Sequence, residues 1–324
     1  MEIKKTKQSL MGLAALMVLF YHLWPVPRGN NAVDSTVRYL LSTAYIAVDL
    51  FFFLSAYTLR FSRTAPFWSY VKRRFLRIYP VFILSCLMAL ALGLLPPSRL
   101  ASTLLGWDLL AHGGASFLWF LPAIMITYLA TPLLLRWTGR MARLRTLLVS
   151  LLIWGLLVWG LEQLPIPHAA NLFLCRLPIF LIGLYLAHFD GQWSAKARLL
   201  AGLVLFCVGV ALTRQFGFQV KLNQPITSFY LLCALPQSLG LILLLDLFFG
   251  RVPLRFFAFL GRHSLSLYAM QMVWTRQLLA ALGPLTGSAL PVASLLAMAI
   301  LLAAACLLDG FVQKGLYHVS AQRT

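Results

Sequence analysis

The chain has 324 residues, of which 61% are hydrophobic and only 11% are charged. Soluble domains carry about 25% charged residues, so this composition excludes ordinary soluble domains, disordered chains and secreted disulfide scaffolds. The formal net charge of +19 would suit a nucleic-acid partner. However, the charges gather between long apolar runs, and this indicates a membrane surface and no nucleic acid.

Ten apolar runs follow one another along the chain. A membrane-spanning helix takes about 20 apolar residues, and most of the runs approach that length, the seventh being short. The runs cover residues 9–24, 43–59, 78–95, 117–135, 144–161, 172–188, 199–213, 228–249, 265–282 and 289–308. We therefore predict an all-α polytopic membrane protein with about ten transmembrane helices, forming a single integral-membrane domain over residues 1–324. The five cysteines all lie inside these runs, in no metal-ligand spacing, so we predict no metal site.

The distribution of Lys and Arg predicts the orientation of these spans. If ten spans alternate in direction, 20 of the 27 basic residues fall on the side that holds both termini, and 7 fall on the other side or in the adjoining span ends. Basic residues favour the cytoplasmic side. Both termini are therefore expected in the cytoplasm.

Two segments between the runs have a recognisable character. Residues 64–77 mix aromatic side chains with Lys72, Arg73, Arg74 and Arg77, a composition typical of a helix that lies in the membrane interface. We expect this helix on the cytoplasmic face. Residues 96–116 are expected to form an outer loop with a short surface helix near 101–110.

His22 and Asp49 are ionisable residues inside predicted spans, and such residues are by default candidates for function. His22 is expected about 4 Å below the outer end of the first span, and Asp49 about 9 Å below the same surface in the second. A carboxylate beside an imidazole fixes its tautomer and makes it a better base. The alternative is an unpaired His at the interface and an Asp satisfied by backbone groups or by an arginine.

The cluster from Lys72 to Arg77 suits a polyanionic ligand. Arg74 and Arg77 are three residues apart and share one helix face, and guanidinium groups bind phosphates in a bidentate manner. Coenzyme A, which carries a pyrophosphate and a 3′-phosphate, fits such a site. The alternative is a patch that only faces anionic lipid.

Six segments resemble, in order, those of membrane-bound acyltransferase family 3, which includes bacterial O-acetyltransferases of surface glycans. They are MGLAALMVLFYH, VDLFFFLSAYTL, YVKRRFLRIYP, FLWFLPAIMITYLATPLL, CRLPIFLIGLYLA and LGRHSLSLYAMQ. The resemblance implies an essential histidine at His22, an acidic position at Asp49 and a serine position at Ser55. It also implies an arginine pair at Arg74 and Arg77 and an aromatic position at Trp119.

Three positions depart from the family pattern. Met11 stands where the first-helix arginine is expected, Gln271 where many relatives have a histidine, and Ala56 where a glycine follows the serine. A thioether replaces neither the charge nor the hydrogen bonds of a guanidinium. We expect Lys7, one helical turn before Met11, to substitute for this arginine in part.

The predicted function is the transfer of an acyl group, acetyl by analogy with the family, from acetyl-CoA to a hydroxyl of a cell-surface glycan or its lipid-linked precursor. The resemblance implies a multi-pass protein of the bacterial cytoplasmic (inner) membrane, with acyl-CoA, the glycan acceptor and the lipid bilayer as partners. The predicted site residues are His22 and Asp49 (catalytic), Arg73, Arg74, Arg77 and Ser55 (binding the CoA donor), and Trp119 and Arg176 (binding the acceptor).

Two rival functions stay open at this stage. One is a permease-like membrane domain, in which buried charges line a translocation path and CoA does not bind. The other is a degenerate acyltransferase that serves as a partner subunit, suggested by Met11 and Gln271. The predicted mechanism also has a geometric difficulty, because His22 and the arginines are expected about 30 Å apart, on opposite sides of the hydrocarbon core.

Overall fold

The computed structural model describes residues 3–27, 29, 31–61, 66–111, 118–139, 144–162, 168–215, 228–282 and 289–321, and these residues form helices and connecting turns without a strand. This confirms the all-α prediction. In chain order the helices are α1 (Ile3–Leu23), α2 (Ala32–Thr43), η1 (Ala44–Ile46), α3 (Ala47–Leu59), α4 (Phe67–Ala91), η2 (Pro97–Arg99), α5 (Leu100–Leu104), α6 (Trp107–Ala111), α7 (Phe120–Gly139), α8 (Leu144–Glu162), α9 (His168–Leu174), α10 (Leu177–Leu186), η3 (Ala187–Phe189), α11 (Ala195–Gln215), α12 (Ser228–Arg251), α13 (Arg255–Arg262), α14 (Ser264–Leu282) and α15 (Ala289–Ala321).

Six helical segments in the described part of the chain are long and apolar enough to cross a membrane. They are Ala32–Leu59, Phe67–Ala91, Ala170–Phe189, Ala195–Gln215, Cys233–Arg251 and Ala289–Lys314, and two shorter apolar segments cover Phe120–Arg136 and Leu147–Leu161. These segments support a multi-pass membrane protein. The count of ten spans and the cytoplasmic location of the termini stay predictions.

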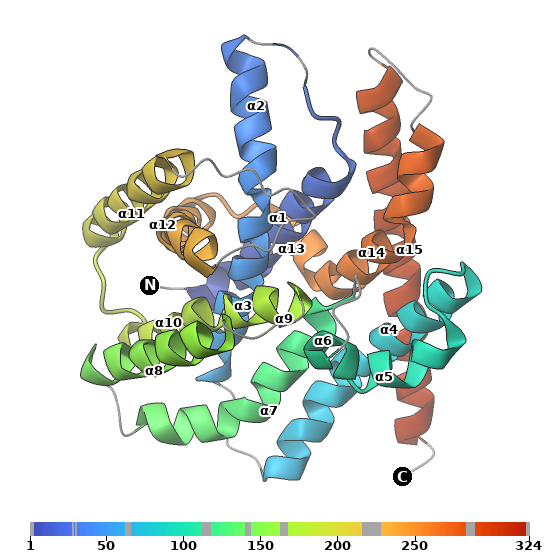
Figure 1. Ribbon diagram of the computed structural model, residues 1–324, viewed down its shortest axis with the longest axis horizontal. Coiled ribbons are helices and arrows are strands. Elements are labelled where there is room, and N and C mark those ends of the chain that lie inside the picture. Colours follow the sequence, from blue (N-terminus) through green and yellow to red (C-terminus); the bar gives the residue numbers. More distant parts are fainter. Residues whose placement is uncertain are drawn as a thin grey trace.

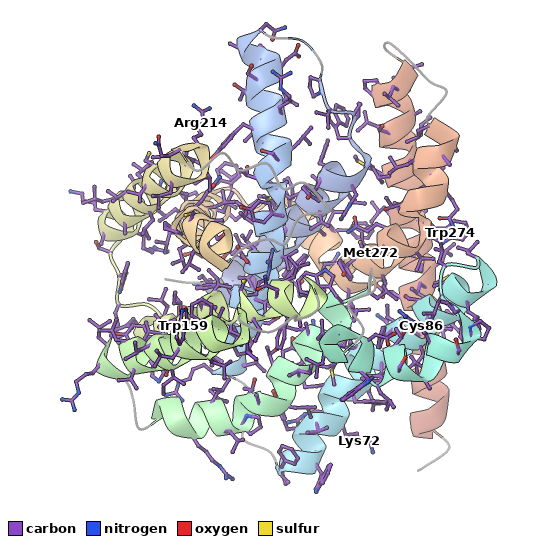
Figure 2. The ribbon with its side chains drawn as sticks, in the orientation of Figure 1. Lys72, Cys86, Trp159, Arg214, Met272 and Trp274 are labelled. Carbon is purple, nitrogen blue, oxygen red and sulfur yellow. The ribbon has the colours of Figure 1, made fainter. Side chains whose placement is uncertain are left out.

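Figure 1 shows α1 and α3 in the middle of the molecule, with α11 and α12 to the left and α14 and α15 to the right. Helices α4 to α7 lie below and to the right of this centre. Helix α3 lies in the core, where its Phe52, Phe53 and Tyr57 are fully buried. By contrast, apolar side chains cover much of the outer surface, including Trp159 and Trp274 (Figure 2). Such an exterior is what a lipid environment requires.

The second predicted span is longer than expected. Helix α2, the 3₁₀ turn η1 and α3 follow one another without a loop, so the apolar segment begins at Ala32 rather than at Thr43. The reason is a helix cap. Asn31 accepts a hydrogen bond from the backbone N–H of Asp34 at 2.8 Å, which starts the helix eleven residues before the apolar run.

The predicted interfacial helix over residues 64–77 is not a separate element. Residues 62–65 lie outside the described part, and Phe67–Ala91 is one 25-residue helix that passes through Pro80. The arginine cluster therefore occupies the first half of α4, and its apolar run forms the second half. The short surface helix predicted near 101–110 is present as α5 and α6, divided at Gly106, whose φ of +74° suits glycine.

The sixth predicted span is interrupted at Arg176, between α9 and α10. Pro178 has no N–H, so the carbonyl oxygen of Leu174 loses its helical partner. The indole Nε1 of Trp154 on α8 donates to that oxygen at 2.8 Å. The break therefore leaves this carbonyl satisfied, and it places the Arg176 side chain in the core.

Glycines bring α1 and α13 into close contact. A Cβ built at Gly12 would lie 1.9 Å from the carbonyl oxygen of Phe257, and one at Gly261 would lie 1.8 Å from that of Gln8. Small residues at helix contacts allow such an approach in membrane proteins. These contacts fix the part of α1 that carries Lys7 and Met11.

We expect Gly12→Ala and Gly261→Ala each to lower the free energy of unfolding by about 1–3 kcal/mol or more, because a methyl group overlaps a backbone carbonyl. Thermal unfolding in detergent measures the change. Gly155→Ala on α8 is the matched control, since its Cβ meets open space and alanine favours the helix by about 0.5–1 kcal/mol. Equal effects at Gly12 and Gly155 would contradict the close approach of α1 and α13.

Candidate functional site

A small cavity of about 50 Å³ lies where α1, α3, α4, α7 and α14 meet. It is lined by Met11, Phe51, Ser55, Arg77, Ile78, Phe120, Ile124, Tyr128, Ser264, Leu265 and Tyr268. Two of the residues predicted to bind the donor, Ser55 and Arg77, are thus in its wall. Met11, which occupies the expected position of an arginine, is in the same wall.

Tyr128 connects Ser55 to the arginine cluster. The Tyr128 hydroxyl donates to Ser55 Oγ at 3.2 Å, in the buried part of α3. The guanidinium carbon of Arg74 lies 5.1 Å from the centre of the Tyr128 ring and 5.3 Å from that of Tyr70, within the range of cation–π attraction. Arg74 is therefore held beside the cavity by two aromatic rings.

Lys7 joins Arg74 and Arg77 as a third cation. Its Nζ donates to Thr58 Oγ1 at 3.1 Å, and Thr58 follows Ser55 by one helical turn. Burial, and then the positive charges of Arg77 and Arg74, lower the pKa of Lys7 to about 8. Lys7 lies just before the predicted first span, and neither it nor Arg77 forms an ion pair within the described ranges.

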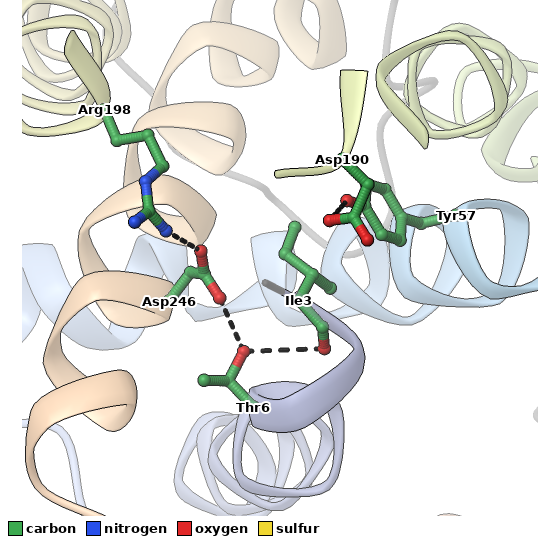
Figure 3. Close-up of polar contacts among 6 residues, drawn as sticks. All are labelled: Ile3, Thr6, Tyr57, Asp190, Arg198 and Asp246. Carbon is green, nitrogen blue, oxygen red and sulfur yellow. Dashed lines mark hydrogen bonds and ion pairs between the residues drawn. The ribbon is translucent and has the colours of Figure 1, made fainter. Parts of the chain in front are cut away.

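A polar network fixes the first turn of α1 and with it Lys7 (Figure 3). Thr6 Oγ1 donates to Asp246 Oδ1 on α12 at 2.6 Å, and Arg198 Nη1 on α11 donates to Asp246 Oδ2 at 2.7 Å. Nearby, the Tyr57 hydroxyl on α3 donates to Asp190. The role of Asp246 in fixing α1 depends on a contact with Thr6, a residue 240 positions away in the sequence.

A second group of polar residues surrounds Asp49 at the start of α3. Arg176 Nε lies 3.5 Å from Asp49 Oδ1, and Ser238 Oγ on α12 donates to Asp49 Oδ2 at 2.8 Å. Asp49 is 5% exposed and Arg176 is 2% exposed. The guanidinium carbon of Arg176 lies 5.6 Å from the centre of the Trp119 ring. The structure therefore brings together Asp49, Trp119 and Arg176, which the sequence had assigned to two different roles.

The structure does not pair His22 with Asp49. The His22 ring packs edge-on against Tyr21, with ring centres 4.9 Å apart, and has no hydrogen bond to Asp49. Asp49 is satisfied by Arg176 and Ser238, which corresponds to the alternative that the sequence left open. A buried carboxylate is stabilised far more by a permanent cation than by a neutral imidazole.

The two polar groups are neighbours. Phe51 follows Asp49 by two residues, Phe120 follows Trp119 directly, and both phenylalanines line the cavity. Their rings lie 5.7 Å apart. His22 lies farther away, eleven residues beyond Met11 on α1, which is about 16 Å of helix.

Arg73, the remaining arginine predicted to bind the donor, is exposed and is not part of the cavity wall. Sequence reasoning named Lys7 only as a substitute for an arginine, and its i, i+4 spacing to Met11 was the signal that placed it at the cavity.

A larger hollow of about 780 Å³ lies elsewhere, between α7, α8 and α10. Its walls are mostly apolar, with Trp154, Phe173 and Phe180 among them. Ligand sites combine apolar walls with convergent polar groups, and this hollow contains none of the charged clusters described above. Its chemistry suits hydrocarbon chains rather than a charged donor.

Comparison with known proteins identifies one family. The sequence model of the acyltransferase 3 family, described as an acyltransferase domain, matches residues 10–308. No curated protein and no solved structure gives a significant match. The match covers every residue that lines the cavity and every residue of the Asp49 group, whereas Lys7 precedes the matched range.

We expect Asp49→Asn to lower the free energy of unfolding by about 3–5 kcal/mol, because it leaves a buried guanidinium without its counter-charge. The double variant Asp49→Asn/Arg176→Gln is expected to be less destabilised than the sum of the single variants, with a coupling of about 1–3 kcal/mol. Chemical unfolding in detergent measures both quantities. Arg99→Gln, at an exposed site, is the control, and additive effects of Asp49 and Arg176 would argue against the pair.

Proposed function

The chain belongs to the acyltransferase 3 family, and from this premise we propose that it transfers an acyl group, in the simplest case acetyl, from acyl-CoA to a hydroxyl of a cell-surface glycan or its lipid-linked precursor. Acyl transfer follows from the family. The donor and the acceptor are the proposed parts. The protein is proposed to act in the bacterial cytoplasmic membrane, with the Lys7 end of α1 facing the cytosol, where CoA is found.

The observation that carries the donor proposal is the gathering of Lys7, Arg74 and Arg77 beside one cavity. Lys7 and Arg74 are half-buried, and Arg77 is exposed at the cavity wall. The three cations repel one another, and an anionic ligand relieves that repulsion. The pyrophosphate and 3′-phosphate of CoA supply several negative charges. Guanidinium groups suit such phosphates, because they offer planar, bidentate hydrogen bonds. The hydroxyls of Ser55 and Tyr128 add donors in the cavity wall.

The length of CoA reduces the geometric difficulty. The arm from its pyrophosphate to its sulfur has about thirteen bonds and, at roughly 1.2 Å per bond in an extended chain, spans about 15 Å. The distance along α1 from Met11 to His22 is about 16 Å. A donor with its phosphates at Arg77 and its arm along α1 would therefore bring the thioester close to the level of His22. The bilayer-wide gap of about 30 Å no longer has to be crossed.

In the proposed reaction His22 acts as general base. It takes the proton of the acceptor hydroxyl, the oxygen attacks the thioester carbonyl, and the C–S bond breaks. The CoA thiolate leaves and recovers the proton. The alternative that the residues allow is nucleophilic catalysis, in which His22 first takes the acyl group and CoA leaves before the acceptor attacks.

Trp119 and Arg176 are proposed to bind the acceptor. The flat face of a tryptophan packs well against the apolar faces of a sugar ring, and a guanidinium donates hydrogen bonds to hydroxyl groups. Asp49 keeps Arg176 in place at 3.5 Å, so we assign Asp49 a positioning role. This assignment replaces the orientation of His22 by Asp49.

We expect CoA binding to weaken above pH 8. Lys7 has a pKa of about 8 in the unliganded protein, and a bound phosphate raises it, so binding above pH 8 takes up a proton. The dissociation constant then rises by up to tenfold per pH unit. Titration of the purified protein with CoA between pH 6.5 and 9.5 measures this slope.

Lys7→Arg and Lys7→Met are the matched variants for that titration. Arginine stays charged over the whole range, so Lys7→Arg is expected to bind with little dependence on pH. Lys7→Met is expected to bind about tenfold or more weakly at pH 7 and also without the slope. The same slope in all three proteins would show that Lys7 does not face the donor.

We expect His22→Gln to lower the rate of acyl transfer by about 10²–10⁴-fold, because a positioned acid–base group contributes that much. Transfer of labelled acetyl from acetyl-CoA to a glycan acceptor measures the rate, and CoA binding is expected to be unchanged.

A second measurement distinguishes the general base from the nucleophile. If His22 is the nucleophile, acid-quenched wild-type protein carries the label and the His22→Gln protein does not. Unchanged transfer after the substitution would exclude His22 from the chemistry, and absence of CoA binding in the wild type would favour the permease alternative.

A further inference from the structure

Gln271 on α14 has a buried side chain with unused hydrogen-bonding capacity. It is 1% exposed, and neither its Nε2 nor its Oε1 has a hydrogen-bond partner among the described residues. Buried polar groups are nearly always paired, because an unpaired one loses its hydration without compensation. The carboxamide carries both a donor and an acceptor. The burial of this carboxamide, with neither its donor nor its acceptor paired among the described residues, therefore requires an explanation.

Helix geometry places Gln271 on the cavity side of α14. Ser264 and Tyr268 line the cavity, and residues 264, 268 and 271 follow one another at spacings of four and three, so they share one helix face. Gln271 lies one turn beyond Tyr268, about 4.5 Å farther along the axis. Helices α1 and α14 pack against each other, and in Figure 1 both run towards the top of the molecule. Gln271 therefore extends the cavity face in the direction in which α1 leads to His22.

The pair of unused groups restricts the ligand. A hydrocarbon chain offers neither donor nor acceptor, and a thioester carbonyl offers only an acceptor. A linear chain with secondary amides offers N–H and C=O groups in succession. The pantetheine arm of CoA is such a chain, with two amides between its pyrophosphate and its sulfur.

We propose that Gln271 binds an amide of the pantetheine arm and so selects a donor that carries this arm. The inference rests on the proposed function, because it takes CoA as the donor. Arg74, Arg77 and Lys7 bind the phosphates, Gln271 holds the arm one turn deeper, and the thioester lies beyond it. Gln271 is thus a specificity-determining residue rather than a participant in the chemistry.

The test compares Gln271→Met with Gln277→Met. Methionine preserves much of the volume and removes the amide. Gln277 is the control because it lies on the same helix with a buried, unpartnered Oε1, but six residues beyond Gln271 it points to another side of α14. Competition with labelled acetyl-CoA is measured for two fragments, pantetheine and adenosine 3′,5′-bisphosphate, together with the melting temperature of the unliganded protein.

We expect Gln271→Met to weaken pantetheine binding about tenfold and to leave the affinity for adenosine 3′,5′-bisphosphate unchanged. Its melting temperature is expected to stay the same or to rise, because an unpaired buried amide is removed. Gln277→Met is expected to change neither affinity. A merely structural role of Gln271 would instead lower the melting temperature and alter both fragments alike.

Three results would overturn the inference: unchanged pantetheine binding in Gln271→Met, equal loss of both fragments, or the same loss in Gln277→Met. Gln271→Leu repeats the comparison if the methionine variant does not fold. The proposed function fails separately, since a wild-type protein that binds neither CoA nor the bisphosphate fragment has no CoA site at all. A wild type that binds both fragments, with Gln271→Met doing the same, overturns only the role of Gln271.

Discussion

The ion pair between Asp49 and Arg176 is the interaction on which the centre of this bundle depends. An isolated charge inside an apolar helix bundle is very unfavourable, so each of these residues requires the other. Their contact joins the start of α3 to the break between α9 and α10, and Ser238 adds α12 to the same point. Because Phe51 and Phe120 lie directly beside this group and line the cavity, the position of the cavity follows from the position of the pair.

The Lys7 end of α1 differs from the centre of the bundle, because three positive side chains gather there. Here Lys7, Arg74 and Arg77 lie together, and the pKa of Lys7 is lowered by its burial and by its like-charged neighbours. Perturbed pKa values of this kind cluster at functional sites, which is the reason for proposing a ligand here. By contrast, hydrogen bonds and an ion pair join Thr6, Asp246 and Arg198 in the neighbouring network, and these contacts hold the first turn of α1 in place. This difference between a charge-balanced network and a cluster of like charges is the physical basis for proposing that one supports α1 and the other binds the donor.

Local sequence patterns predicted a good part of this arrangement. The spacing of Arg74 and Arg77 predicted a shared face, and Ser55 and Arg77 do line one cavity. The pairing of His22 with Asp49 was wrong, because depth in the membrane predicts only that two groups can meet, whereas charge decides which ones do. The interfacial helix was predicted as a separate element because the aromatic and basic composition of residues 64–77 resembles one, but the backbone continues through Pro80 as a single helix that begins at Phe67.

The sequence by itself determined the helical character, the apolar segments, the family and the grouping of residues that lie within a few turns of one another, because helix periodicity and hydrophobicity are properties of short segments. Only the tertiary structure decided that Arg176 serves Asp49, that Lys7 lies beside Arg74 and Arg77, and that the Gln271 amide is buried without a partner. These contacts connect residues 67 or more positions apart or depend on the packing of several helices. They result from the free energy of pairing buried polar groups throughout the bundle, which no local pattern encodes.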